Sequence, residues 1–182
     1  KCRDMPEHCL KITLATLLLS LACISACAQK HCIGTVYGYS GMGLYHELDT
    51  DDGSFTRVTL YAETAEAFSG RTSIPGISAS FTWNFAIAVM ESVCGNKITI
   101  FAGPGIAAGL CRDFKSDTGF FFGLKGRAGV RCIYKRNVDI SISIAPVIGS
   151  HLTFREEAID MRYFKGGLMK AFMPEIGIGY RF

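Results

Sequence analysis

The segment Glu175-Ile176-Gly177-Ile178-Gly179-Tyr180-Arg181-Phe182 decides the fold, because its two sets of alternate positions are unlike. Apolar residues stand at the even positions, whereas Glu, Gly and Arg stand at the odd positions. A period of two is typical of a β-strand whose two faces meet different surroundings. In a soluble domain an aromatic residue at a fraying chain end would be left in water. We therefore expect a non-aqueous environment on the even face of this strand.

The same alternation recurs upstream along most of the chain. The alternating segments are 35–48, 54–65, 77–89, 97–110, 119–133, 138–149 and 168–182. Turn residues such as Lys135-Arg136-Asn137 separate them. The pattern predicts about eight strands, an even number as barrel closure usually requires. The eighth strand comes either from residues 159–165 or from a bend near Gly38 or Gly41. With the first choice, the turns at 94–96 and 135–137 would lie opposite the chain termini.

Each segment has two rows of alternate residues, one for each face of the strand. The size of the residues in the two rows predicts which face lies inside the barrel. The apolar rows hold Ile, Phe, Leu and Trp with few polar interruptions, as a lipid-facing band needs. The other rows hold Gly, Ala, Ser and a few long charged side chains, which suit the narrow interior of an eight-stranded barrel. An open edge in lipid would leave backbone groups unpaired. We therefore predict an all-β, closed antiparallel up-and-down transmembrane β-barrel. A secreted soluble barrel with the apolar rows inside is the alternative.

Six charged residues fall in the small and polar rows and are expected in the lumen: Lys125, Arg127, Arg131, Asp139, Glu175 and Arg181. Buried charges are stable only when they are paired. We therefore predict a salt-bridge network that holds the lumen shut. A pore lining or an anion site is the alternative interpretation of the same residues.

The first residues predict export. Lys11 precedes the apolar run 12–21, and small residues follow it as far as Ala26-Cys27-Ala28. This order is typical of a signal peptide cleaved before Gln29, and the run is shorter than the about 20 residues of a membrane-spanning helix. We expect a signal helix over residues 1–28 and a barrel domain over residues 29–182. Residues 24–27 also resemble the lipobox of bacterial lipoproteins, so lipidation at Cys27 is an alternative.

Charge and cysteine spacing argue against several classes of function. The chain has 19 Lys and Arg against 16 Asp and Glu, and this small excess is dispersed, whereas nucleic-acid binding requires a clustered basic face. Beyond residue 28, cysteines stand at positions 32, 94, 111 and 132, without the C-x-x-C spacing of zinc sites. Export would permit disulfides, but the sequence does not choose partners. We expect no nucleic acid, metal or cofactor.

Two short motifs suggest chemistry that their context does not support. Gly103-Pro104-Gly105 lacks the G-x-G-x-x-G spacing of a nucleotide loop and continues as a strand. Ser150 and His151 are neighbours, so a strand sends their side chains to opposite faces, whereas a nucleophile and its base must share one face. No catalytic residue is expected, and a lipid-modifying barrel enzyme is the least supported alternative.

The segment 175–182 resembles the C-terminal assembly signal of Gram-negative outer-membrane β-barrel proteins. Glu175, Gly177, Tyr180 and Phe182 occupy its polar, glycine, hydrophobic and final aromatic positions. More loosely, residues 34–182 are similar to the small outer-membrane barrel families of about eight strands. The resemblance implies location in the outer membrane, contact with its lipid, and insertion by the outer-membrane barrel assembly machinery. It implies no enzymatic activity.

These expectations together predict a small outer-membrane protein with a structural or surface-interaction role. A narrow, porin-like channel for small solutes or ions is the alternative. The regions expected to contact an extracellular ligand are the loops near residues 66–74, 112–118 and 151–162.

Overall fold

The computed structural model describes residues 31–50, 53–64, 76–91, 96–113, 118–155, 158–169 and 173–182. The described elements are β1 (His31–Gly38), β2 (Gly41–Asp49), β3 (Phe55–Glu63), β4 (Gly76–Glu91), β5 (Lys97–Arg112), β6 (Thr118–Tyr134), β7 (Val138–Ile144), β8 (Val147–Arg155), β9 (Ala158–Tyr163), α3 (Lys165–Met169) and β10 (Glu175–Arg181). The expected signal helix at 1–28 lies outside the described residues. Among the residues described, no helix is long and apolar enough to cross a membrane.

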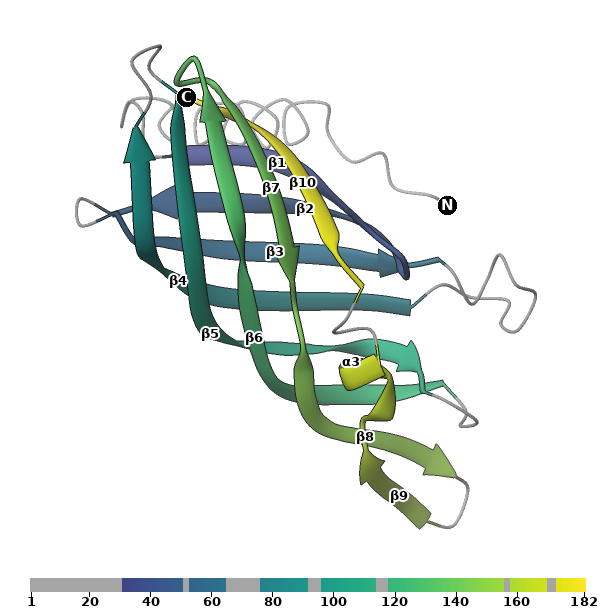
Figure 1. Cartoon of the computed structure of the whole chain (residues 1–182). Coiled ribbons are helices and arrows are strands. Elements are labelled where there is room, and N and C mark those ends of the chain that lie inside the picture. Colours follow the sequence, from purple (N-terminus) through teal and green to yellow (C-terminus); the bar gives the residue numbers. More distant parts are fainter. Residues whose placement is uncertain are drawn as a thin grey trace, which may run out of the picture.

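The strands form a closed, eight-stranded antiparallel barrel with two extra strands (Figure 1). Strands β1 to β6 pair in chain order, and β10 pairs with both β1 and β7 to close the wall. β7 and β8 pair with successive parts of β6, and β9 pairs with β8. The all-β closed barrel expected from the alternating sequence is therefore confirmed.

The two ends of the barrel differ in their connections. At one end, which we call the turn end, β1 begins, β10 ends and a three-residue turn joins β6 to β7. In that turn Lys135 and Arg136 both have positive φ, 48° and 67°, as a tight hairpin turn requires. The opposite end, the mouth end, carries the β1–β2 turn, the β3–β4 connection and α3. Figure 1 shows β4, β5 and β6 bending sharply on their way to the mouth end.

The bend expected near Gly38 or Gly41 is present, so residues 35–48 belong to two strands and not to one. β1 and β2 pair up to Gly38 and Gly41 and enclose a two-residue turn between them. This hairpin reverses the direction of every later strand, relative to an arrangement in which 35–48 is a single strand. The turn at 135–137 therefore lies at the same end as the start of β1 and the end of β10, not opposite them. Both proposed sources of an extra strand exist, since β9 covers most of the segment 159–165.

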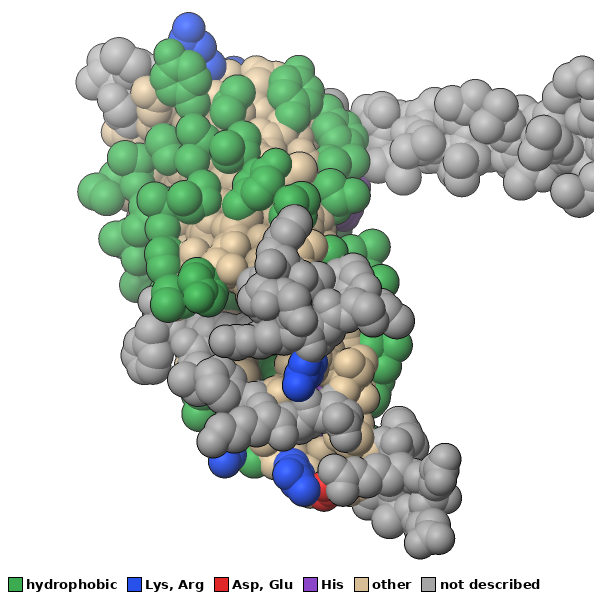
Figure 2. Space-filling view, turned by 90° about the vertical axis from the view of Figure 1, so that its right-hand side faces the viewer, with side chains coloured by type: hydrophobic (Ala, Val, Ile, Leu, Met, Phe, Trp, Pro, Cys, Tyr) green, Lys and Arg blue, Asp and Glu red, His purple; other side chains and the backbone are tan. Residues whose placement is uncertain are grey.

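Side chains are distributed between the two faces of the barrel wall as the alternation predicted. Large apolar side chains such as Ile77, Leu124 and Ile178 point outward, with half or more of their surface exposed. Polar side chains on the alternate positions are buried inside the barrel. Figure 2 shows hydrophobic side chains spread over much of the upper part of one face, with basic groups at its upper edge and the other visible charged groups in its lower half. The strict alternation expected through residue 89 breaks at a bulge between Ala86 and Ala88.

Helix α3 packs inside the mouth end beside the bent part of the wall. β10 stops pairing with β7 at Ser143, and Phe164 donates a backbone hydrogen bond to Gly149 where β9 ends. Between these points the chain forms α3 instead of strand. Both carboxylate oxygens of Asp113 accept backbone N–H groups at the start of α3, from Lys165 and Gly166 at 3.2 and 2.8 Å. Asp113 thus caps the helix and ties its first turn to the end of β5.

Candidate functional site

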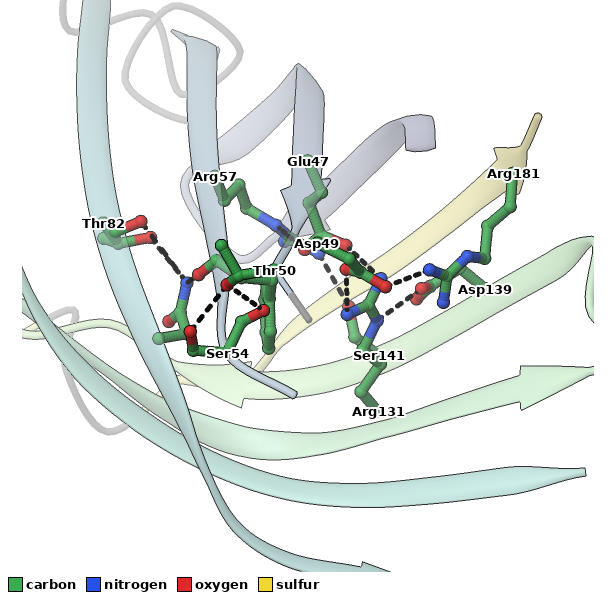
Figure 3. Close-up of polar contacts among 12 residues, drawn as sticks. Glu47, Asp49, Thr50, Ser54, Arg57, Thr82, Arg131, Asp139, Ser141 and Arg181 are labelled. Atoms are coloured by element: carbon green, nitrogen blue, oxygen red, sulfur yellow. Dashed lines mark hydrogen bonds and ion pairs between the residues drawn. The ribbon is translucent and has the colours of Figure 1, made fainter. Parts of the chain in front are cut away.

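A cluster of seven charged side chains fills the turn-end half of the lumen, and all of them except Arg127 are labelled in Figure 3. We call it the lumen cluster, and its members are Glu47, Asp49, Arg57, Arg127, Arg131, Asp139 and Arg181. They come from five strands, β2, β3, β6, β7 and β10. Apart from Asp49, each is at most 8% exposed. The barrel therefore has an ionic core in the place where a soluble barrel has an apolar one.

Glu47 is the centre of the lumen cluster and is fully buried. Its Oε1 accepts a hydrogen bond from Arg57 Nε at 2.5 Å, and its Oε2 lies 2.9 Å from Arg131 Nη2. Arg127 Nη1 lies 3.7 Å from Oε1 on a third side. Three guanidinium groups from two opposite parts of the wall thus converge on one carboxylate. A buried carboxylate of this kind is stable only because these cations replace its water.

Arg131 connects Glu47 to the other two carboxylates. Its Nε donates to Asp139 Oδ2 at 2.5 Å and its Nη1 donates to Asp49 Oδ1 at 2.9 Å. Asp49 also accepts a hydrogen bond from Arg181 of the closing strand β10. A planar guanidinium has five donors in a fixed fork, and Arg131 uses this geometry to bridge β2, β6 and β7. The network therefore ties both sides of the β1–β10 seam together.

Aromatic rings support the three arginines that surround Glu47. Arg57 stacks on Tyr45, with its Cζ atom 3.7 Å from the ring centroid. Arg127 lies 4.6 Å from the centroid of Phe101, and Arg131 lies 4.4 Å from that of Phe55. Such cation–π contacts are worth about 0.5–2 kcal/mol each when desolvated. The three inward aromatic rings, each at most 2% exposed, also fill the space that the guanidinium planes leave.

Cys32, Glu47 and Asp139 are the one described group of three that could hold a metal by distance, with ligand atoms within 4.8 Å of one another. Both carboxylates are, however, already bound by Arg131, and Glu47 is also bound by Arg57. A cation placed there would meet at least two guanidinium charges at close range in a low-dielectric interior. The charge of the surroundings therefore argues against a metal site. Cys32 and Cys132 are free thiols, and Cys94 lies outside the described residues.

A second polar region lies toward the mouth end, where the lumen widens into a cavity of about 70 Å³. We call it the mouth cavity. Three charged residues, Lys125, Glu63 and Glu175, line it together with Tyr61 and Ser80. Lys125 Nζ donates to Ser80 Oγ at 3.1 Å. Phe121 and Phe164, whose rings stack with centroids 4.7 Å apart, line the cavity on the α3 side.

The six charged residues expected in the lumen all lie on the inner face of the wall. Arg127, Arg131, Asp139 and Arg181 belong to the lumen cluster, whereas Lys125 and Glu175 line the mouth cavity. The structure therefore does not bring the six into one network. Three cluster members were missed in the sequence: Glu47, Asp49 and Arg57. A regular alternation with Val58 and Leu60 marks Arg57 as inward, and that signal was available.

The remaining sequence-based candidates occupy ordinary structural places. His151 is 1% exposed, and its Nε2 lies 3.0 Å from the carbonyl oxygen of Cys111. Ser150 stands on the opposite face, so the two do not form a catalytic pair. Of the expected contact loops, residues 66–74 lie outside the described residues, as does the middle of 112–118. The region 151–162 is not a loop over most of its length, because β8 and β9 occupy it.

The residues of the expected assembly signal lie in β10, except Phe182, which follows it directly. Tyr180 points outward and is 58% exposed, whereas Gly177 points inward. A Cβ at Gly177 would lie 2.5 Å from Ser141 Oγ, so a larger residue there would require the Ser141 side chain to shift. Phe182 donates a backbone hydrogen bond to His31 and thereby extends the β1–β10 seam.

Comparison with protein-family models, curated proteins and solved structures finds no match to this chain. The functional argument therefore rests on the geometry of the barrel.

Proposed function

We propose that this chain is a small outer-membrane β-barrel protein with a sealed lumen and a structural or surface-interaction role. The observation that carries the proposal is the inverted distribution of side chains. Large apolar residues cover the outside, and ionised side chains fill the inside. Burial of a large apolar side chain stabilises a fold in water by about 1.5–3 kcal/mol. In water, this arrangement would forgo that stabilisation at each exposed apolar residue. In a bilayer the same residues are solvated by lipid.

The closed wall supports the same location. Every strand position from β1 to β10 has a hydrogen-bonded neighbour on each side around the turn-end half. An unpaired edge in hydrocarbon would cost several kcal/mol for each exposed backbone group. A secreted soluble barrel does not need an apolar outer surface of this extent, and this alternative is accordingly less well supported.

The lumen cluster supports a sealed barrel over a narrow channel. Its side chains reach across the lumen from opposite strands and meet at Glu47. An ion that crossed the barrel would have to break pairs in a low-dielectric interior, where each broken buried pair costs about 3–5 kcal/mol. The cluster therefore acts as a septum. With the mouth end facing the cell exterior, the connections at this end would be the regions that contact an extracellular ligand.

Cell fractionation with an unheated and a heated gel sample tests the membrane location. We expect the folded chain in the detergent-extracted outer-membrane fraction, with a mobility that changes on heating because the barrel resists detergent at room temperature. Recovery of a folded chain from the periplasm without detergent would contradict the proposal. A Phe182→Ser variant, compared with Phe182→Tyr, tests recognition by the assembly machinery, and only the serine variant is expected to accumulate unassembled.

Conductance in planar bilayers tests the septum. The natural chain is expected to give no steady current. The double variant Glu47→Ser/Arg131→Ser removes side chains from the centre of the lumen cluster and is expected to give one, while Lys135→Gln at the turn end serves as control. A steady current through the natural chain that is lost on changing Arg127 and Arg131 would establish the channel alternative instead.

A further inference from the structure

Three charged side chains line the mouth cavity: Lys125, Glu63 and Glu175. Lys125 and Glu175 both line it, and within the described part of the chain neither takes part in an ion pair within 4.0 Å, in contrast to the members of the lumen cluster. Lys125 is held by one neutral hydroxyl, that of Ser80. Charged groups withdrawn from bulk water gain stability from an opposite charge. The cavity therefore presents Lys125 to an anionic group, and it presents Glu175, with Glu63 in the same lining, to a cationic group.

We propose that the mouth cavity binds a small zwitterion that carries an ammonium group and a carboxylate. The carboxylate binds Lys125 and Ser80, and the ammonium binds Glu175. Tyr61 also lines the cavity, and aromatic rings attract cations. A ligand with both charges satisfies both sites at once, whereas a ligand with one charge leaves the other site unsatisfied.

The size of the cavity restricts the ligand. A cavity needs roughly 10–15 Å³ on this measure to hold one water molecule. The mouth cavity of about 70 Å³ therefore accommodates about five to seven non-hydrogen atoms. Glycine, β-alanine and 4-aminobutanoate fall in this range. The stacked Phe121 and Phe164 rings bound the cavity on the side of α3 and exclude a longer substituent there.

The position of the cavity fits a binding site better than a stabilising core. It lies at the mouth of a barrel, a place where ligand sites occur frequently, and it adjoins the bend at which α3 replaces strand in the wall. The lumen cluster closes the other side, so a ligand enters and leaves by the mouth end alone. The proposal depends only on the barrel interior and not on membrane location.

Saturation-transfer NMR on the purified full chain in detergent micelles tests the proposal. The probes are glycine, β-alanine and 4-aminobutanoate, with acetate and methylammonium as singly charged controls. We expect at least one zwitterion to receive saturation and to bind at least tenfold more tightly than either control. Equal binding of acetate or methylammonium, or no binding of any zwitterion, would overturn the proposal.

Variants of Lys125 and Glu175 test which charge of the ligand each residue binds. Lys125→Met and Glu175→Gln are each expected to weaken zwitterion binding at least tenfold, while Lys135→Met and Glu91→Gln, outside the cavity, leave it unchanged. The heat-dependent gel shift of each variant shows that it is folded. The exchanged double variant Lys125→Glu/Glu175→Lys keeps both charges and is expected to recover binding. Unchanged binding in the single variants would refute the assignment, and binding by a chain that proved soluble would refute only the membrane location.

Discussion

The two halves of the lumen use the same residue types in opposite ways. In the lumen cluster each charge contacts at least one opposite charge, and aromatic rings cover three of the arginines. In the mouth cavity Lys125 and Glu175 share a wall without meeting. The difference teaches that burial of charge in a barrel is not by itself a sign of function. Pairing contributes to folding, whereas unpaired charges around a space are available to a ligand.

The largest expected effect comes from the centre of the lumen cluster. Glu47→Gln keeps the shape but leaves Arg57, Arg127 and Arg131 without their shared anion. Removing one partner of a buried pair costs about 3–5 kcal/mol of unfolding free energy. Urea unfolding followed by fluorescence of Trp83, the single tryptophan, measures the loss. The control is Glu91→Gln, whose side chain is 74% exposed 4.0 Å from Lys97, where a change of about 0–1 kcal/mol is expected. Equal losses in the two variants would remove the distinction between the regions.

A smaller effect is expected from Arg131→Lys. Lysine keeps the charge but lacks the planar fork that reaches Glu47, Asp49 and Asp139 together. We expect a loss of about 1–3 kcal/mol of unfolding free energy, the usual range for charged hydrogen bonds. Arg127→Lys is the matched comparison, because Arg127 makes one hydrogen bond, to Ser143, and one longer ion pair. A greater loss for Arg127→Lys would place the centre of the network elsewhere.

At the mouth end, Asp113 caps the start of α3. Asp113→Ala removes the acceptor of the Lys165 and Gly166 amides, and loss of a helix cap costs about 0.5–2 kcal/mol. Hydrogen exchange at these two amides is expected to become faster, while exchange in β1 and β10 is unchanged. Asp113→Asn retains an acceptor oxygen and should protect at least one amide. Uniform acceleration over the whole barrel would show that α3 is not an independent part of the structure.

The smallest effect on stability is expected inside the mouth cavity. Lys125→Met keeps the length of the side chain and removes a charge that has one hydroxyl partner and no ion pair among the described residues. We expect the unfolding free energy to change by less than about 1 kcal/mol. The same urea titration as for Glu47→Gln measures it. A loss comparable to that of Glu47→Gln would mean that Lys125 is a structural residue, and the two halves would then not differ.

Much of this organisation is present in the sequence because a strand has a period of two. Arg127, Arg131 and Asp139 stand in regularly alternating segments, so their inward direction follows from parity. Glu47 and Asp49 do not, because the two-residue turn at 39–40 changes the parity. Even positions point inward in β1, as Cys32 does, whereas odd positions point inward in β2, as Tyr45 does. A single-strand interpretation of 35–48 loses the inner face there.

The division between cluster and cavity was not predictable, because it depends on distances along the barrel axis. Lys125 and Arg127 are adjacent on the inner row of β6, yet one belongs to each region. The reason is the neighbour across the wall: Arg127 lies beside Ser143 and near Glu47, while Lys125 reaches Ser80 of β4. Such neighbours depend on strand register and on the bend at Pro146. Alternation alone specifies neither.

The ion pair between Arg181 and Asp49 has a consequence for the time course of folding. The two residues are 132 positions apart in the chain, and they come together only when β10 docks on β1. Contacts of such long range are slow to form, because the entropy of closing the loop must be lost first. Interactions made after the rate-limiting step mainly slow unfolding rather than speed folding. The β1–β10 seam is therefore expected to make unfolding slow. A folded barrel would then persist for a long time even where its equilibrium stability is modest.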